Sequence, residues 1–153
     1  MKGNDMSDGI VVSFHSKWLP ILSRGAIKYV FRKRGPQNMN PKWMYVYVGS
    51  PTKAVVGRLP VTHVDTRTLR DCVGQASGGA ITADELNKYA DGYERLFVFT
   101  VGHYQAAARP ASLAALSSKH RFVPPQSFLV LSIPGARVLD EMCKFGSGKV
   151  ASL

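Results

Sequence analysis

The sequence predicts an α+β fold, a small and partly closed mixed β-barrel of five to six strands with short flanking helices. Short runs rich in β-branched and aromatic residues recur along the chain, which is typical of strands. Helical segments are few and short. They do not alternate regularly with the strands, which argues against a doubly wound parallel sheet. The 153 residues are enough for one domain with its own core.

In the first half of the chain, apolar and β-branched runs predict four strands. A short helix follows the first strand and ends at Gly25. The second strand alternates Ile27, Tyr29 and Phe31 with a mostly basic set, so we expect the bases on the face away from the core. Pro60 indicates a bulge or an edge in the fourth strand. The predicted strands are Ile10–His15, Ile27–Arg34, Trp43–Val48 and Ala54–Val64.

The second half of the chain mixes helix and strand signals. Thr82 and Glu85 form a capping box, which predicts a helix through Ala90. The Gly/Ser-rich segment Gln75–Ala80 before it indicates a mobile loop. Strands are expected at Glu94–Val101 and Tyr104–Ala108, and the last apolar segment is Gln126–Ile133. Helices are expected at Thr66–Val73, Pro110–Ser118 and Val138–Phe145.

The chain shows no repeats and no linker of domain size, so we expect one domain over residues 10–145. Residues 1–9 and 146–153 are expected to be flexible ends. Cys72 and Cys143 are too few for a disulfide framework. No apolar run is long enough for a membrane span, and the N-terminus lacks the apolar core of a secretory signal. We therefore expect a cytoplasmic protein with no membrane partner, and the sequence leaves its oligomeric state open.

The positive charge is concentrated in one block of the sequence. The chain has a formal net charge of +10. From Gly9 to Val64 there are nine Lys or Arg residues and no Asp or Glu, whereas the rest of the chain holds eleven bases and ten acids. A generic solvated surface would interleave both signs. The block therefore favours a polyanionic partner, with nucleic acid as the first candidate.

Three segments stand out from this background. Residues 21–34 are ILSRGAIKYVFRKR, residues 45–57 are YVYVGSPTKAVVG, and residues 124–128 are PPQSF. In this order and spacing they resemble the opening, second and closing blocks of the ASCH domain, a member of the PUA-like superfamily. The resemblance covers most of the chain, and it implies a small PUA-like barrel with flanking helices and a cleft on one side.

The resemblance also implies a function and a site. Members of the ASCH family are mostly regarded as RNA-binding modules, some are similar to hydrolases of acylated cytidine nucleosides, and ribonuclease activity is associated with the family. Hydrolase-type members carry a lysine, a threonine and an acidic residue where this chain has Ile27, Val30 and Arg58. None of these three side chains can attack or shuttle a proton, which argues against an amidohydrolase. By motif position, the cleft would hold Lys28, Arg32, Tyr47, Ser50, Lys53 and Ser127.

The residues themselves indicate a phosphate-binding surface. The basic candidates are Lys17, Lys28, Arg32, Lys33 and Arg34. Together they can neutralise several phosphates, and arginine can also fork onto one phosphate or stack on a base. Among the aromatic residues, Tyr47 can either stack a base in the cleft or pack in the core. A solvated basic face without a ligand is the alternative.

Tyr47, Lys53 and Ser127 are the candidate catalytic residues. A lysine with a lowered pKa can act as a base or steady a phosphorane, and the two hydroxyls can bond phosphate oxygens. The same three side chains can also bind a nucleotide without chemistry. Histidines, cysteines and carboxylates do not form a ligand set for a metal, so we expect no metal and no cofactor. His15 is the histidine next to the basic block.

The sequence therefore predicts a module that binds RNA or a nucleotide in a basic cleft. The RNA could be single-stranded or structured. The first alternative is a ribonuclease that uses the same cleft. A hydrolase of acylated cytidine and a protein-interaction module for an acidic partner are the remaining alternatives.

Overall fold

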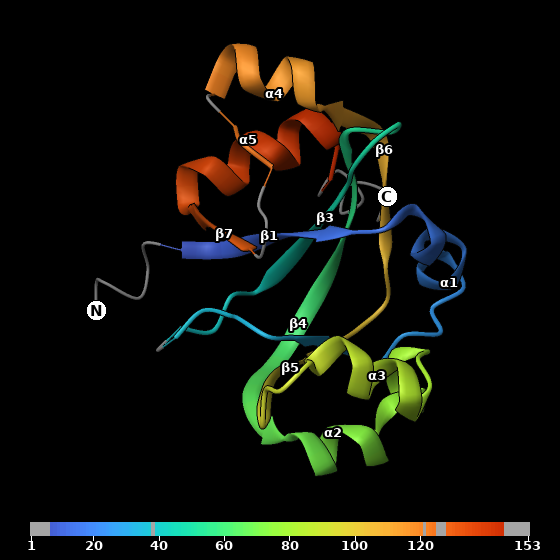
Figure 1. The fold of residues 1–153 in the computed structure, drawn as a ribbon. Coiled ribbons are helices and arrows are strands. Elements are labelled where there is room, and N and C mark those ends of the chain that lie inside the picture. Colours follow the sequence, from blue (N-terminus) through green and yellow to red (C-terminus); the bar gives the residue numbers. More distant parts are fainter. Residues whose placement is uncertain (1–6, 38, 121, 125–127, 146–153) are drawn as a thin grey trace.

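The computed structural model describes residues 7–37, 39–120, 122–124 and 128–145. Short helices flank a seven-stranded sheet (Figure 1). The strands are β1 (Ser7–Phe14), β2 (Tyr29–Arg32), β3 (Trp43–Val48), β4 (Ala54–Thr68), β5 (Arg95–Val101), β6 (Gln105–Ser112) and β7 (Phe128–Ser132). The helices are α1 (Leu19–Ser23), α2 (Leu69–Gly74), α3 (Ala83–Ala90), α4 (Leu113–His120) and α5 (Ile133–Cys143), with 3-10 turns η2 (Ser16–Trp18) and η3 (Ala76–Gly79).

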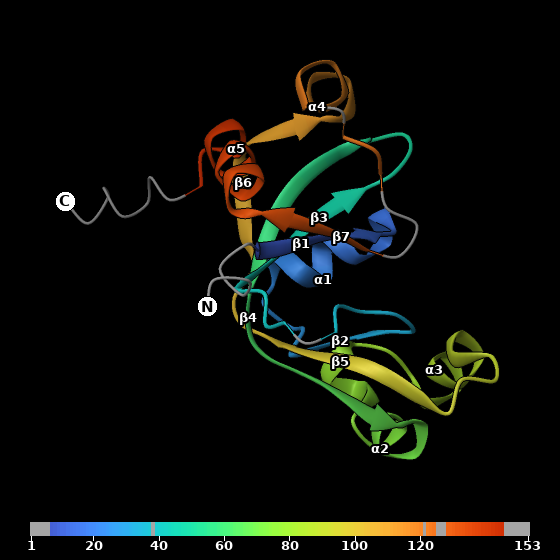
Figure 2. The ribbon, with the colours of Figure 1, turned by 90° about the vertical axis from the view of Figure 1, so that its left-hand side faces the viewer.

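Strand β4 joins the two parts of the sheet. The strand order is β2-β5-β4-β3-β1-β7, and β6 pairs with β4 beside this path. Strands β1 and β3 are parallel, and the other pairings of the described strands are antiparallel. The first half of β4 pairs with β3 and β6, and its second half pairs with β5. The sheet therefore bends into two parts that share one long strand (Figure 2).

The α+β class and the mixed strand directions agree with the sequence-based prediction. The strand count is seven rather than five to six, because the last apolar segment also contains a strand, β7. The strand expected at Tyr104–Ala108 continues to Ser112 as β6. Strands β2 and β7 end the path and do not pair with each other in the described part of the chain, so the sheet is not closed. The barrel part of the prediction is therefore not confirmed.

Three apolar clusters form the core. The first lies between the two parts of the sheet and includes Ile10 and Phe99. The second lies between the sheet and helices α4 and α5, around Tyr45 and Leu139. The third packs α2 and α3 against β2 and β5, around Leu86. Apolar clusters thus cover parts of both faces of the sheet. Strand β2 lies between the first and the third cluster.

This double burial corrects the prediction for the second strand. Val30 and Phe31 are neighbours in β2, yet both are buried, Val30 in the first cluster and Phe31 in the third. A basic, solvent-facing side of β2 therefore does not exist. Arg32 shares the face of Val30, and its side chain turns inward rather than projecting into solvent, as the contacts below show.

Several boundaries also differ from the prediction. β4 continues to Thr68, so α2 starts later than expected, with the Thr68 hydroxyl accepting from Asp71 N–H as its cap. Residues 7–9, expected in the flexible N-terminus, belong to β1. The glycine-rich segment before α3 is η3, with Gly79 buried against Phe31. The capping box of Thr82 and Glu85 is confirmed.

α5 begins at Ile133, five residues before the predicted helix and at the end of the last apolar segment. The expected tail at 146–153 lies outside the described residues. None of the helices in the described ranges combines the length and the apolarity that a bilayer span requires.

Candidate nucleic-acid interface

A cleft of about 980 Å³ lies between the end of β1, strand β2 and helix α3. β1 and β2 are not neighbours in the strand order, so backbone pairing does not close the gap between them. We call this gap the β1–β2 seam. Among the described residues, the cleft lining carries one acid, Glu85. The bases that line it are Lys17, Arg32, Lys33, Arg34 and Lys88.

Arg32 crosses the seam with its side chain. Its guanidinium donates to the carbonyl of Phe31 at 2.8 Å and to the carbonyl of Ser13, on β1, at 3.3 Å. It also lies 4.7 Å from the centre of the Phe14 ring. Burial lowers the pKa of Arg32, since no carboxylate among the described residues pairs with it. Within the described part of the chain, carbonyl groups and the Phe14 ring are the groups that surround this half-buried cation.

Lys33 lies against two tyrosines of the opposite wall. Its ammonium is 5.1 Å from the Tyr89 ring centre and 5.5 Å from the Tyr93 ring centre. Its backbone N–H donates to the Tyr89 hydroxyl at 3.0 Å. These contacts tie the end of β2 to α3 and leave the amine at the face of both rings.

Lys17 and Glu85 belong to opposite sides of the cleft. Lys17 follows β1, and its ammonium lies 5.5 Å from the Trp18 ring centre. Its backbone N–H donates to His15 Nδ1 at 3.1 Å, which caps η2. Glu85 accepts from Thr82 N–H at 2.9 Å. The hydrogen bonds with Thr82, together with the charge of Lys17, lower the pKa of Glu85. Glu85, the acid of the cleft lining, thus caps the N-terminus of α3.

The sequence-predicted basic residues divide between two locations. Lys17, Arg32, Lys33 and Arg34 line the cleft, as expected. Lys28 does not line it, because this residue is exposed and precedes β2, where its backbone bonds Gly78 and Val101. Lys53 does not line it either, so the cleft brings together four of the six bases that the sequence singled out.

Tyr47 does not line the cleft. It is 3% exposed on β3, in the cluster beneath α4 and α5, with its ring centre 5.9 Å from that of Phe122. Burial raises the pKa of its phenol. Of the two locations that the sequence left open, core and cleft, the structure places Tyr47 in the core, because its side chain points to the helix-covered face of β3.

The remaining candidates lie near the β3–β4 turn or outside the described residues. Ser50 and Lys53 are exposed in this turn, where Ser50 precedes a cis proline and Lys53 adopts a positive φ of 47°. Neither residue lines the cleft. Ser127 lies outside the described residues. The expected convergence of Tyr47, Lys53 and Ser127 on the basic cleft is thus not seen for the two residues that can be placed.

Solved structures share this architecture. The chain matches a variant of ZmASCH from Zymomonas mobilis with a TM-score of 0.80 and 19% identity, over 90% of this chain and 97% of that chain. The ASCH protein of Zymomonas mobilis itself matches with a TM-score of 0.78 and 20% identity, over 88% and 95%. The chain has the ASCH fold. The resemblance inferred from three short segments is therefore confirmed at the level of the fold.

More distant structures share parts of the ASCH fold. The N-terminal domain of Staphylothermus marinus McrB matches with a TM-score of 0.56 and 11% identity, over 89% of this chain and 94% of that chain. Rpa0253 from Rhodopseudomonas palustris matches with a TM-score of 0.54 and 13% identity, over 92% and 93%. No protein-family model and no curated protein matches the sequence.

Within this ASCH fold, the positions that hydrolase-type members use are structural. Ile27 and Val30 are buried in the first core cluster. Arg58 is 6% exposed, and its guanidinium lies 3.6 Å from the Trp43 ring centre and 3.0 Å from Asp140 Oδ1. These side chains hold the core and α5, so they supply no acid or base for hydrolysis.

The sequence did not predict the aromatic residues that line the cleft. Tyr89 and Tyr93 line it from α3 and the residues that follow, and Trp18 lines it from η2. Leu86 and Tyr89 are three residues apart in a predicted helix, a spacing that is typical of a face packed in the core. No signal in the sequence showed that Leu86 is a core residue and that Tyr89 also lines the cleft. Trp18 directly follows Lys17 in the sequence, and an aromatic residue next to a candidate phosphate-binding lysine was the one available indication of a stacking residue.

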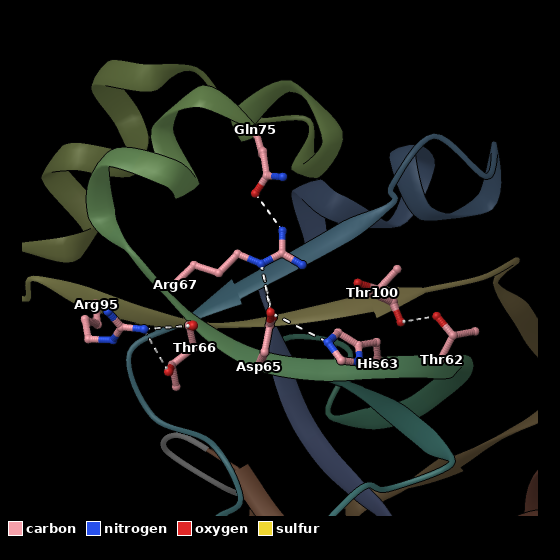
Figure 3. A network of polar contacts seen from close by, with 8 residues as sticks. All are labelled: Thr62, His63, Asp65, Thr66, Arg67, Gln75, Arg95 and Thr100. Atoms are coloured by element: carbon pink, nitrogen blue, oxygen red, sulfur yellow. Dashed lines mark hydrogen bonds and ion pairs between the residues drawn. The ribbon is translucent and has the colours of Figure 1, made fainter.

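A polar network lies on the second half of β4, and one of its members, Arg67, contacts the cleft lining (Figure 3). Arg67 donates to Asp65 at 3.1 Å and to Gln75, just before η3, at 2.7 Å. Its guanidinium also lies 5.4 Å from the ring centre of Tyr29, a cleft residue. The ion pair with Asp65 raises the pKa of Arg67. Within the described ranges, no group of three His, Cys, Asp or Glu side chains is placed to hold a metal ion.

Proposed function

We propose that this ASCH-fold protein binds RNA or a nucleotide in the cleft at the β1–β2 seam. The observation that carries the proposal is the charge of the lining, where five bases from three elements surround one acid. Arg32 adds a desolvated guanidinium without a carboxylate partner among the described residues. A phosphate would supply the missing anion.

The chemistry of the lining matches a polynucleotide better than a generic anion. Lysines and arginines neutralise phosphates, and aromatic faces in a basic groove stack bases. The cleft has both, since Trp18, Tyr89 and Tyr93 lie among the bases. The ASCH fold supports the same proposal through the RNA-binding modules of the PUA-like superfamily that it resembles.

Fluorescence anisotropy with a short labelled RNA at low salt tests the proposal. The double variant Lys17→Ala/Arg34→Ala removes two exposed bases from the cleft lining. We expect weaker binding and a salt dependence flatter by about 1.4, because each phosphate of a single strand that is neutralised contributes roughly 0.7 to the slope. The matched control is Lys28→Ala/Lys42→Ala, which removes two exposed bases of the same sequence block that do not line the cleft.

Equal weakening in the two double variants would show a diffuse charge effect and would contradict the cleft proposal. Competition by heparin at the same charge concentration as RNA would favour an acidic protein partner instead.

The ribonuclease alternative was expected to use the same cleft, but two of its three candidate residues do not line it. Tyr47 and Lys53 lie near the end of β3 and in the turn after it, away from the cleft lining. Solved ZmASCH variants replace a serine and a tyrosine, the residue types of two of our three candidates. Recovery of the labelled RNA after incubation tests this activity, and cleavage that disappears in Lys53→Ala would support it.

A further inference from the structure

We propose that Lys33, Tyr89 and Tyr93, here called the aromatic wall, form a base-stacking site that makes the cleft select unpaired nucleotides. This inference rests on the proposed function and adds the form of the ligand to it. The wall combines two ring faces with an amine, and all three residues line the cleft.

Tyr93 is the exposed member of the wall, whereas Lys33 and Tyr89 are half-buried and Tyr89 packs against the third core cluster. The Tyr93 residue is 38% exposed to solvent. Its backbone N–H donates to the Ala90 carbonyl at 2.9 Å, after a turn in which Asp91 and Gly92 adopt positive φ angles of 42° and 91°. The Tyr89 hydroxyl accepts from Lys33 N–H. The hydroxyl contact holds the Tyr89 ring, and the turn fixes the backbone from which the Tyr93 ring projects, so a base that stacks here has less of the site to order.

The position of the Lys33 ammonium shows which face of the wall is available. It rests at 5.1 Å and 5.5 Å from the two ring centres, on the cleft side. A flat base can take this place while the flexible ammonium turns to the phosphate of the same nucleotide. Arg32 and Arg34, the chain neighbours of Lys33, also line the cleft, so the phosphate-binding bases are adjacent to the stacking site.

Stacking of this kind discriminates between single strands and duplexes. In a duplex, the faces of each base are covered by its neighbours, whereas an unpaired base can be splayed onto a protein ring. The basic residues attract both forms of RNA, since both carry phosphates. The aromatic wall therefore adds affinity for the single strand alone.

The test compares two variants of Tyr93 on one short labelled RNA, used as a single strand and annealed to its complement. We expect Tyr93→Leu to weaken single-strand binding about tenfold, within the range of about five- to hundredfold for one stacked base, and to leave duplex binding unchanged. Tyr93→Phe keeps the ring and should keep wild-type affinity. Thermal unfolding of both variants checks that this exposed position does not affect folding.

The outcomes separate the two proposals. Loss of single-strand binding in Tyr93→Leu, with retention in Tyr93→Phe, supports the aromatic wall. Unchanged binding in Tyr93→Leu, while Lys17→Ala/Arg34→Ala still weakens it, overturns the wall and leaves the phosphate-binding cleft standing. Equal weakening on single strand and duplex also overturns the wall. Absence of RNA binding by the wild-type protein overturns the proposed function itself.

Discussion

Two arginines with little access to water illustrate how single residues divide between structure and binding. Arg58 has a carboxylate partner, Asp140, and is held between the rings of Trp43 and Phe145. Arg32 has only carbonyl groups and the Phe14 ring. A buried charge that is paired belongs to the scaffold, whereas one that lacks an opposite charge in the described part of the chain can accept an external anion.

Glu85 allows a sharp residue-scale prediction, because its charge and its capping bond can be separated. Glu85→Gln removes the acid from the cleft lining but keeps an acceptor for Thr82 N–H. We expect RNA binding at low salt to tighten by about two- to fivefold, since an exposed charge pair contributes modestly. Anisotropy titration measures the change.

Asp84→Asn is the matched control for Glu85→Gln. It removes an exposed acid from the same turn of α3 that does not line the cleft. Equal tightening in both variants would contradict a local effect of Glu85.

Among the elements, α5 is joined to the sheet by a polar network as well as by the second apolar cluster. Asp140 of α5 accepts from Arg58 of β4 and, at 2.6 Å, from the Tyr45 hydroxyl of β3. Arg58 also donates to Gln105 of β6 at 2.8 Å. Three strands thus meet one helix through a single guanidinium and a single carboxylate.

The element-scale prediction follows from this network. Arg58→Ala should lower the free energy of unfolding by about 2–4 kcal/mol, because it removes the opposite charge from Asp140, removes the donor from Gln105 and empties the space beside Trp43. RNA affinity should not change, since Arg58 does not line the cleft. Denaturant unfolding measures the first effect. Arg109→Ala, at an exposed arginine of β6, should be nearly neutral, and a similar loss there would contradict the assignment.

The elements also show what sequence patterns can predict. The β-branched runs located the strands, and the Thr82–Glu85 pair located α3, because both signals are local. The face of a strand was harder to predict. Period-two alternation placed Phe31 inside and Arg32 in solvent, but helices cover one side of β2 and β1 covers the other. Tyr47 illustrates the same ambiguity, since alternation alone does not say which face of β3 meets the cleft.

For the whole molecule, the site could be predicted only in part. The acid-free block of sequence indicated a positive surface, and four of its bases line the cleft. Lys88, Tyr89 and Tyr93 lie beyond that block, and only the folding of α3 against β2 brings them to the same place. Contacts between distant segments carry no local signal, so this half of the site required the structure.

Alkaline pH should destabilise the whole fold through two buried groups. Burial raises the pKa of Cys143 to about 11 and that of Tyr104 to about 12, from ordinary values of 9.0 and 10.0. The folded state favours the neutral forms, so their contribution is complete below about pH 9 and is lost as pH rises through 11 to 12. The melting temperature should fall over this window.

A cysteine variant separates this effect from the titration of surface lysines. Cys143→Ala should show a smaller fall between pH 9 and 11 than the wild-type protein. Identical pH profiles for the two proteins would show that the buried thiol does not contribute.

The seam between β1 and β2 has a geometric consequence. Paired strands keep a fixed separation of about 4.8 Å, imposed by the repeat of the backbone ladder. Across the seam, the reach of the Arg32 side chain to the Ser13 carbonyl takes the place of that ladder. Residue 32 therefore helps to set the width of the opening, together with the apolar side chains of the first core cluster that lie between the same two strands. A substitution of residue 32 alters the clearance at the place where a hydrogen bond of its side chain spans the two strands.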